Sequence, residues 1–349
     1  MPNTTAPQTA LTASTPPFTV RPARADEFGV IVTVIENAFR AGPYGHLSVS
    51  AERRAFECDA AGRAESGTLL VAVDDADRVT GTVSLLRAGT RYARLARPGE
   101  AEVRLLAVDP ATRGNAVGDA LVRVSLECAL EWGELAVVLD TGSENPAQRA
   151  CTRLGFERLP ERDPAVVVGG VQLLVFSYRL QQRDDVVVRL MRPEETDAVS
   201  LLSERAYSHD YELSDPYRAS IMAVEDRALE HQVWVAEDAA SGDLLGTVST
   251  PHAGEAISDL ARPGELDFRL LAVDPAVRRH GIGELLTRHV LGLARIRGLG
   301  SVVMNSGPEM TSAHRLYETL GFERMPDREP VLELGGHTVK LLSFRRPTS

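Results

Sequence analysis

The stretch Leu270–Leu286 reads LLAVDPAVRRHGIGELL and combines three local signals. Its apolar run ends at Pro275, because proline lacks the N–H that a strand ladder needs and disfavours helix in the residue before it. Two arginines and two glycines follow. Apolar residues then recur at Leu286, Val290 and Leu293, the i, i+4, i+7 spacing of a helix face. The stretch therefore predicts a strand, a glycine-containing turn and a helix.

Segments of this stretch and its surroundings occur twice in the 349 residues. LARPGE stands at Leu95–Glu100 and again at Leu260–Glu265, and LLAVDPA stands at Leu105–Ala111 and again at Leu270–Ala276. The offsets agree, since 260 − 95 = 165 and 270 − 105 = 165. Such a period is the size of a domain and far above the roughly 20–50 residues of a solenoid repeat. The chain therefore contains one domain twice.

The limits of the two copies follow from the polar seam at Gln181–Asp185. We predict an N-terminal copy over residues 18–181 and a C-terminal copy over residues 185–346, and we predict residues 1–17, rich in Thr, Ala and Pro, as a disordered tail. Each copy also places a Gly-Gly pair between β-rich runs, at 169–170 and 335–336, which is typical of a hairpin turn.

The C-terminal copy shows the order of elements most clearly. A helix begins near Pro193, and a late helix ends at Gly321. Strand-like runs occupy Val186–Leu190, Gln232–Asp238, Leu244–Thr250, Leu266–Val273 and Ser301–Asn305. The N-terminal copy repeats this order. The fold class is therefore α/β (α+β), with two tandem domains that each hold a mixed, largely antiparallel sheet flanked by helices.

Composition limits the classes of function. The chain has 38 Lys and Arg against 49 Asp and Glu, a net charge of −11, which argues against nucleic acid or an anionic membrane as partner and is compatible with a cationic small molecule. No apolar run reaches the roughly 18 residues of a membrane span. Cys58, Cys128 and Cys151 cannot form a disulfide framework, so we expect a cytoplasmic protein. The histidines lack metal-ligand spacing, so we expect no metal.

Arg278, Arg279, Gly281 and Gly283 lie directly before the predicted helix. Glycine allows a ligand to approach the backbone closely, and the first turn of a helix has unpaired N–H groups. The helix dipole and the arginines add positive potential, so the turn suits a pyrophosphate. An ordinary turn with solvated arginines would show the same residues and stays open as the alternative.

Two motifs carry a resemblance to a known family. The pattern Arg-x-x-Gly-x-Gly at Arg278–Gly283, after a strand that ends in LAVDP, resembles the acetyl-CoA loop of the GNAT superfamily of N-acyltransferases. The pattern Ala-x-x-Leu-Tyr-x-x-x-Gly-Phe at Ala313–Phe322 is similar to the late helix and following strand of that family. The resemblance covers nearly all of both copies and implies a sheet that splays between its fourth and fifth strands.

The resemblance also implies roles for individual residues. Tyr317 matches the tyrosine that acts as general acid near the thioester sulfur, and Asp267 matches a position where many members carry the glutamate that takes the amine proton through water. A packed helix tyrosine and a hydrogen-bonded strand carboxylate are the respective alternatives. Acetyl-CoA would be bound by the residues Leu271, Ala272, Val273, Arg278, Arg279, His280, Gly281, Ile282, Gly283 and Glu284.

The segment from Tyr207 to Tyr217 falls where this family builds part of its acceptor pocket. Its aromatic and acidic side chains suit an ammonium group, by charge and by cation–π contact. A solvated polar loop with helix caps is the alternative that we favour. The residues concerned are Tyr207, Asp210, Tyr211, Glu212, Asp215 and Tyr217.

The N-terminal copy departs from the family pattern. Its loop has Gly114 in place of the second arginine and Ala116 in place of the first motif glycine, so that a methyl group stands where close approach is needed. Cys151 occupies the position of Tyr317, whereas Glu102 matches the family's base better than Asp267 does. We therefore expect the N-terminal copy to be the weaker or inactive half, which shapes the acceptor site or acts as an intramolecular pseudo-dimer partner.

These observations predict an N-acetyltransferase that uses acetyl-CoA as co-substrate and acetylates an amine of a small, cationic molecule by direct attack in a ternary complex. We expect a monomer or a homodimer. Two alternatives stay open. One is a non-catalytic sensor or scaffold that binds acyl-CoA, and the other is an acyltransferase with a carrier-protein or aminoacyl-tRNA donor.

Overall fold

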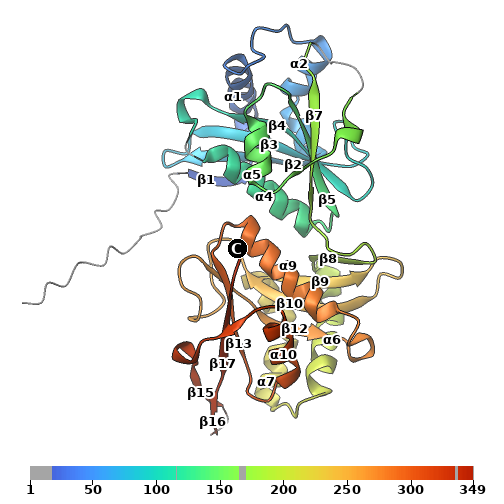
Figure 1. Ribbon diagram of the computed structural model, residues 1–349, viewed down its shortest axis with the longest axis vertical. Coiled ribbons are helices and arrows are strands. Elements are labelled where there is room, and N and C mark those ends of the chain that lie inside the picture. The colour runs from blue at the N-terminus through green and yellow to red at the C-terminus, as the bar shows by residue number, and fades with distance from the viewer. Residues whose placement is uncertain (1–17, 115, 165–169, 335–336, 349) are drawn as a thin grey trace, which may run out of the picture.

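A computed structural model describes residues 18–348, apart from residues 115, 165–169 and 335–336. The predicted tail 1–17 and the glycines 169, 335 and 336 of the two predicted turns lie outside the described residues. The two copies form two lobes, one above the other in Figure 1. Strand β7 ends at Arg179 and strand β8 begins at Val186, on either side of the predicted seam.

The N-terminal lobe is built on one seven-stranded sheet in the order β1-β2-β3-β4-β5-β7-β6. All neighbouring strands are antiparallel except β4 and β5, as expected for a largely antiparallel sheet. The strands are β1 (Phe18–Pro22), β2 (Gly67–Asp74), β3 (Val79–Arg87), β4 (Glu100–Val108), β5 (Ala136–Gly142), β6 (Glu157–Arg158) and β7 (Leu173–Arg179).

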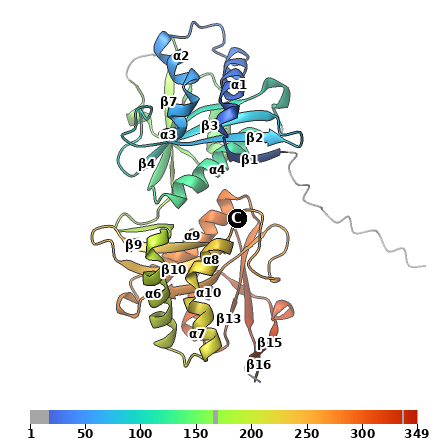
Figure 2. The ribbon, with the colours of Figure 1, turned by 180° about the vertical axis from the view of Figure 1, so that it is seen from behind.

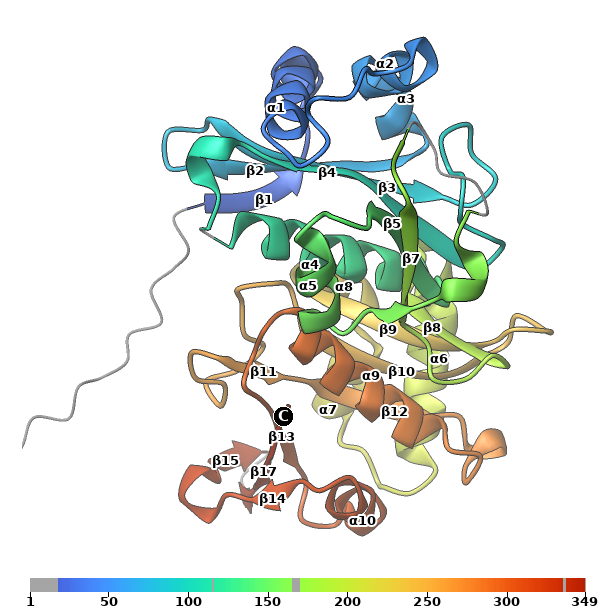
Figure 3. The same ribbon diagram turned by 45° about the horizontal axis from the view of Figure 1, so that its top comes forward.

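Helices cover both faces of this sheet, as Figure 3 shows. Helices α1 and α3 pack on one face, around Ile31, Ile35 and Val71, while α4 packs on the other face through Leu121 and Leu126. The helices are α1 (Phe28–Arg40), α2 (Ala51–Cys58), α3 (Ala60–Glu65), α4 (Val117–Glu131) and α5 (Ala147–Arg153).

The C-terminal lobe repeats this plan, but its sheet is divided into the orders β8-β9-β10-β12 and β11-β13-β17-β14, with β15 and β16 as a separate hairpin. The strands are β8 (Val186–Leu190), β9 (His231–Asp238), β10 (Leu244–Pro251), β11 (Glu265–Asp267), β12 (Arg269–Val273), β13 (Ser301–Ser306), β14 (Glu323–Arg324), β15 (Val331–Leu334), β16 (His337–Lys340) and β17 (Leu342–Pro347).

Helices also flank the C-terminal sheet, and three of them, α6, α7 and α8, lie on the side away from α9 (Figure 2). Two of these, α7 and α8, fall in a region where the sequence pattern alone did not predict helices. The helices are α6 (Thr196–Ser208), α7 (Asp215–Met222), α8 (Val224–Glu230), α9 (Ile282–Ile296) and α10 (Thr311–Thr319).

The prediction of one continuous strand over Leu266–Val273 is wrong, because this segment forms β11 and β12. A β-bulge lies beside the break: Thr247 pairs with Ala272 and Ser249 with Arg269, so two residues oppose one. The bulge contains Leu270, which has a left-handed φ of +52°. A left-handed leucine is costly, and such bulges re-aim the backbone next to functional sites.

The two halves of this strand pair with different partners. Strand β11 pairs in parallel with β13 over Glu265–Asp267, whereas β12 pairs only with β10. The other edge of β12 is therefore left without a strand in the described structure. The N-terminal lobe separates in the same way, since β4 and β5 pair only over Glu100–Val103. We call this separation of β12 from β13 the splay.

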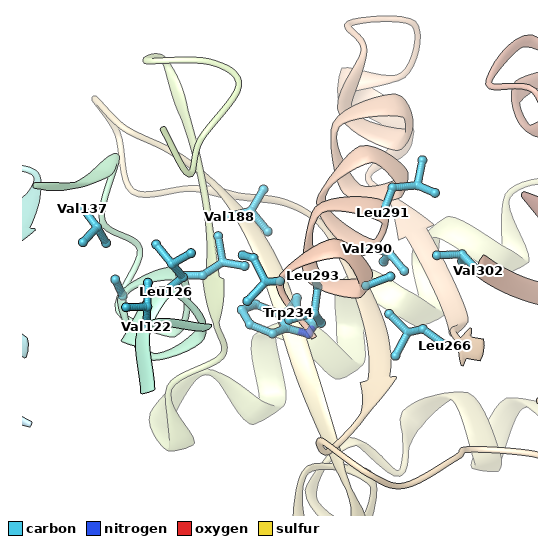
Figure 4. Close-up of a cluster of buried hydrophobic side chains, with 14 of the residues drawn as sticks. Val122, Leu126, Val137, Val188, Trp234, Leu266, Val290, Leu291, Leu293 and Val302 are labelled. Carbon is cyan, nitrogen blue, oxygen red and sulfur yellow. The ribbon is translucent and has the colours of Figure 1, made fainter. Parts of the chain in front are cut away.

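The two lobes share one hydrophobic core, drawn in Figure 4. Helix α4 packs against α9, the helix at the equivalent place in the second copy, and Trp234 is fully buried among side chains of both lobes. Burial of one such side chain contributes roughly 1.5–3 kcal/mol. The copies therefore form one folded unit.

Polar contacts also join α4 to the C-terminal end of α9. Arg123 of α4 donates to the carbonyls of Arg295 and Ile296, at 2.8 and 3.0 Å. Arg297 donates to Glu127 at 2.6 Å, and the side chain of Arg297 is only 5% exposed. The arrangement brings the equivalent helices of the two copies into contact.

Candidate functional site

The turn before α9 has the backbone that its glycines predict. Gly281 caps the helix with φ +79° and ψ +6°, a left-handed conformation that favours glycine. Gly283 lies against the late helix, so that a Cβ there would come within 3.2 Å of Leu316. The buried Ile282 anchors the first turn of α9 in the core. The core therefore holds the first turn of α9 in place, and the N–H groups of this turn have no partner within the helix.

The side chain of Arg278 does not point along this turn. It donates to Asp210 at 2.6 Å and to the carbonyl of Ala206 at 2.7 Å, and so ties the loop to the end of α6. Arg113 makes the equivalent contact in the N-terminal lobe, to the carbonyls of Ala38 and Ala41. Both arginines therefore hold a loop against a helix end.

Positive charge at the turn comes instead from other side chains. Arg279 and His280 are exposed, and Arg279 itself has a left-handed φ of +64°. Arg183, from the seam between the copies, donates to the carbonyl of His280 at 2.8 Å and is paired with Asp185. Sequence reasoning missed Arg183, because it lies in the seam and outside every motif.

The turn fits a diphosphate. A Cβ added at Gly281 would meet only the guanidinium of Arg183, at 3.6 Å, so the space beside the helix end is open. No described carboxylate pairs with Arg279, whereas Glu284 is occupied by Arg288 one turn later, at 2.8 Å. Open space, unpaired amides and a free arginine together suit an anion.

The edge of β12 lies in line with this turn. Ala272 and Val273 pair with Thr247 and Gly246 of β10, so their opposite edge faces the splay. The phenol of Tyr207, on α6, lies 3.4 Å from the carbonyl oxygen of Leu271. The predicted segment Leu271–Val273 is thus the stretch of strand that a ligand in the splay would meet.

Tyr317 projects from α10 into an aromatic cluster beside the splay. Its ring lies 6.1 Å from Phe268, 5.7 Å from Phe322 and 6.0 Å from Phe344, measured between centroids. The residue is 3% exposed, and burial raises the pKa of its phenol well above the ordinary value. The phenol therefore keeps its proton at neutral pH.

Asp267 is buried in β11, and both of its oxygens accept hydrogen bonds. Oδ1 accepts from the backbone of Ile257 at 3.0 Å, and Oδ2 from the hydroxyl of Ser258 at 2.8 Å. Glu102 takes the same part in the N-terminal lobe, where Oε2 accepts from the backbone N–H groups of Arg94 and Leu95. Both carboxylates thus hold the loop that precedes their strand.

The predicted acceptor segment is only partly a loop, since α6 extends to Ser208 and α7 begins at Asp215. Tyr207 and Tyr217 come together edge to face, 6.2 Å apart. Asp210 is taken up by Arg278, while Glu212 is exposed. The two tyrosines therefore lie together beside β12, and the acidic side chains do not gather around them.

The N-terminal lobe keeps the loop backbone but changes its side chains. Ala116 adopts φ +60° and ψ +8°, nearly the angles of Gly281, with a methyl group added. Asn115 of this loop lies outside the described residues. Cys151 is buried at the position of Tyr317, and burial raises the pKa of its thiol to about 11.

Within the described ranges, no three His, Cys, Asp or Glu side chains gather where they would hold a metal ion. Every helix in the same part of the chain is too short or too polar to traverse a bilayer.

Comparison with known proteins agrees with the geometry. The family described as "Acetyltransferase (GNAT) domain" matches residues 230–324, and "Acetyltransferase (GNAT) family" matches residues 33–156. Each match falls within one lobe and includes its splayed strand and the following helix.

Curated relatives span both lobes. The chain is 30% identical to a mycothiol acetyltransferase of Rhodococcus jostii (strain RHA1), over 75% of this chain and 82% of that protein. It is 29% identical to a mycothiol acetyltransferase of Rhodococcus opacus (strain B4), over 72% and 78%. A solved ribosomal-protein-S18-alanine N-acetyltransferase from Escherichia coli is 18% identical, over 47% of this chain and 94% of that chain, with a TM-score of 0.35.

Proposed function

Because the chain belongs to the GNAT acetyltransferase family and is thus an acetyl-CoA-dependent acyltransferase, we propose that its C-terminal lobe transfers acetyl groups to an amine of a small molecule. The observation that supports this lobe is the free edge of β12, in line with the open turn at Gly281 and beside Tyr317. The N-terminal lobe has the same backbone without the glycine and the tyrosine.

Acetyl-CoA, when bound, supplies an activated acyl group as a thioester. Its diphosphate would be held by the first-turn amides of α9, at Ile282, Gly283 and Glu284, with Arg279 and His280 beside them. The edge of β12 at Leu271–Val273 would hold the extended part of the co-substrate and orient the carbonyl through backbone N–H groups.

Tyr317 is the proposed general acid. Its phenol is protonated at neutral pH, and its place among Phe268, Phe322 and Phe344 excludes water from around the ring. A proton held at its Oη can pass to the thiolate that leaves when the amine attacks. We propose direct attack in a ternary complex, without a covalent enzyme intermediate.

The role of Asp267 as the base stays a prediction. The hydrogen bonds that it accepts from Ile257 and Ser258 are those of a residue that holds a loop in place. Substitution of Asp267 would therefore lower activity whichever role it has. The variant Asp267→Asn separates the two, because the amide oxygen can accept from Ile257 and the amide nitrogen can donate to the hydroxyl of Ser258, but the amide cannot take a proton. Loss of turnover with unchanged thermal stability would support the base, and unchanged turnover would contradict it.

The finer features of the proposal concern the donor, location and assembly. We propose acetyl-CoA, rather than a carrier protein or aminoacyl-tRNA, as donor, because the described turn suits a diphosphate and the net charge is −11. We also propose a cytoplasmic monomer, in which α4 and α9 make the contact between the lobes. The prediction of a cationic acceptor rests on the net charge and on the aromatic and acidic side chains of the segment from Tyr207 to Tyr217.

Thiol release tests the proposal. The purified chain is mixed with acetyl-CoA and a panel of small amines that includes the acceptor of mycothiol acetyltransferases, and free CoA thiol is measured. We expect thiol release that depends on one of the amines. Tight binding of acetyl-CoA without release for any amine would contradict the proposal and support the sensor instead.

A further inference from the structure

A cavity of about 270 Å³ lies in the C-terminal lobe, between helices α7 and α8 and strands β9, β10 and β12. Its lining includes Ser220, Ala223, Arg227, Arg269 and Leu270. Leu270 is the left-handed residue of the bulge, and the next residue is the one whose carbonyl Tyr207 contacts. The cavity therefore adjoins the strand where we propose that transfer occurs.

The duplication identifies what fills the same place in the N-terminal lobe. Arg63 donates to the carbonyl of Glu57 at 3.0 Å, and Arg227 donates to that of Ile221 at 3.1 Å, so these arginines are equivalent. At this offset, 227 − 63 = 164, and at the offset of 165 that LARPGE sets further along the chain, three large or charged residues of the N-terminal lobe align with smaller or apolar ones in the C-terminal lobe. The pairs are Phe56 and Ser220, Asp59 and Ala223, and Tyr92 and Ile257.

In the N-terminal lobe these side chains pack on one another. The guanidinium of Arg104, equivalent to Arg269, lies 4.2 Å from the centroid of the Phe56 ring. The ring of Tyr92 lies 5.0 Å from that of Phe56, and its hydroxyl contacts Asp59. The C-terminal lobe has lost all three partners and kept both arginines, which is how the cavity arises.

The loss also removes a carboxylate from the neighbourhood of the retained arginine. In the N-terminal lobe, burial lowers the pKa of Arg63 to about 10, and Asp59 is the largest influence that opposes this shift. Ala223 stands at the position of Asp59, so the C-terminal lobe lacks this carboxylate. Arg63 also donates to the hydroxyl of Ser84, at 2.9 Å, whereas among the described residues the guanidinium of Arg227 donates only to the backbone carbonyls of Ser220 and Ile221. The Nε of each arginine is buried without a hydrogen-bond partner.

Other charged groups at the cavity do not take the place of that carboxylate. Asp226 and Glu230 contribute to its lining, but both are exposed, and neither forms an ion pair with Arg227 or Arg269 among the described residues. The ring Nδ1 of His231, also in the lining, is buried without a partner. A partly buried, unpaired arginine is costly, and an anionic ligand would offset that cost.

We propose that the acceptor amine carries a carboxylate or phosphate group, and that Arg227 and Arg269 bind this group in the cavity. The inference rests on the proposed function, since it describes the acceptor of the same site. Pockets that hold a whole ligand have volumes of roughly 300–1,000 Å³, so the smaller volume of this cavity suits one group of a ligand. The guanidinium of arginine binds carboxylate and phosphate groups through pairs of parallel hydrogen bonds. This proposal replaces the expectation of a cationic acceptor, which was drawn from the net charge and from the segment from Tyr207 to Tyr217.

Matched amines test the inference. Thiol release from acetyl-CoA is measured with glycine against glycinamide, with phosphoethanolamine against ethanolamine, and with putrescine. We expect kcat/KM to be at least about tenfold higher for the anionic member of one pair, with putrescine below both. The pair with the larger ratio distinguishes carboxylate from phosphate. Equal rates within both pairs, or a preference for putrescine, would overturn the inference.

The variant Ala223→Asp restores the carboxylate that the N-terminal lobe has. Asp59 caps α3 by accepting from the backbone of Gly62, so an aspartate at 223 suits the start of α8. We expect it to lower kcat/KM about tenfold for the anionic amine, and to leave the neutral amine and the KM for acetyl-CoA within about twofold. The exposed Arg262→Gln is the control for lost surface charge. An equal loss for both amines would contradict the inference.

A binding measurement separates this inference from the proposed function. If no amine in the panel is acetylated, the melting temperatures of the unmodified chain and of Ala223→Asp are compared in inorganic phosphate, acetate and chloride at equal ionic strength. A larger rise in phosphate or acetate for the unmodified chain would support an anion site in the cavity, even with the transferase proposal refuted. Equal rises in both proteins would overturn the site.

Discussion

The two lobes agree in backbone and differ in the side chains that would face a ligand. Leu105 and Leu270 have φ angles of +51° and +52°, and Ala116 and Gly281 adopt nearly the same turn. The bulge and the splay are therefore properties of the fold and do not by themselves indicate activity. What distinguishes the C-terminal lobe is a tyrosine in place of Cys151 and a cavity in place of packed side chains.

The largest expected effect concerns the tyrosine. Tyr317→Phe removes the proton donor and keeps the ring in its aromatic cluster, so we expect kcat to fall roughly 100-fold or more while acetyl-CoA still binds. Cys151→Ser is the matched change in the N-terminal lobe, and we expect it to leave kcat within about twofold. Initial rates of thiol release provide the measurement, and similar losses in both variants would break the comparison between the lobes.

A smaller effect is expected at the turn. Gly281→Ala places in the C-terminal lobe the methyl group that Ala116 carries at the same angles, so the variant should fold at a cost of about 1 kcal/mol. We expect the KM for acetyl-CoA to rise about tenfold, because the methyl group stands beside the first-turn amides. The reverse change, Ala116→Gly, should leave this KM unchanged. A KM that does not respond to Gly281→Ala would show that close approach at this glycine is not needed.

The smallest expected effect concerns the contact between the lobes. Burial, with Glu127 nearby, raises the pKa of Glu131 from 4.5 to about 7. The folded chain therefore binds this proton more tightly than the unfolded chain does, so stability is lost as pH rises from about 4.5 to about 7. Glu131→Gln removes the titration, and we expect it to raise the free energy of unfolding by about 1–2 kcal/mol at pH 8 and by almost nothing at pH 4.5.

Urea unfolding at the two pH values measures this difference. Glu127→Gln is the control, because it removes the partner of the nearly buried Arg297 and should destabilise the chain at pH 8. A stabilising effect of Glu131→Gln that is equal at both pH values would show that the carboxyl does not titrate in this range.

The sequence predicted the repeat, the order of strands and the position of the turn, because these depend on local patterns and on motifs that occur twice. It did not predict the break between β11 and β12. The break falls at Phe268, whereas Leu105 has the same left-handed φ as Leu270 within the unbroken β4, so neither residue type signals where a strand will divide. Residues 215–230 were likewise not predicted to be helical, since α7 and α8 are short and only weakly patterned.

The direction of side chains was harder to predict than the position of the backbone. Arg278 belongs to the turn motif, yet its guanidinium contacts Asp210 and Ala206, because the chain bends back toward α6. One signal was available: Arg113 is retained in the lobe whose turn has lost its glycine, as expected of a structural residue. The cavity beside Arg227 depends on Ser220 and Ala223, and only alignment of the two lobes makes these small residues meaningful.

Calorimetric titration of CoA into the unmodified chain, Gly281→Val and Ala116→Val tests the central claim most directly, because both substitutions place the same bulky side chain at equivalent positions. The account predicts that Gly281→Val loses most of the binding heat and all thiol release, and that Ala116→Val keeps both. Equal losses in the two variants, or a loss confined to Ala116→Val, would contradict the assignment of the active site to the C-terminal lobe.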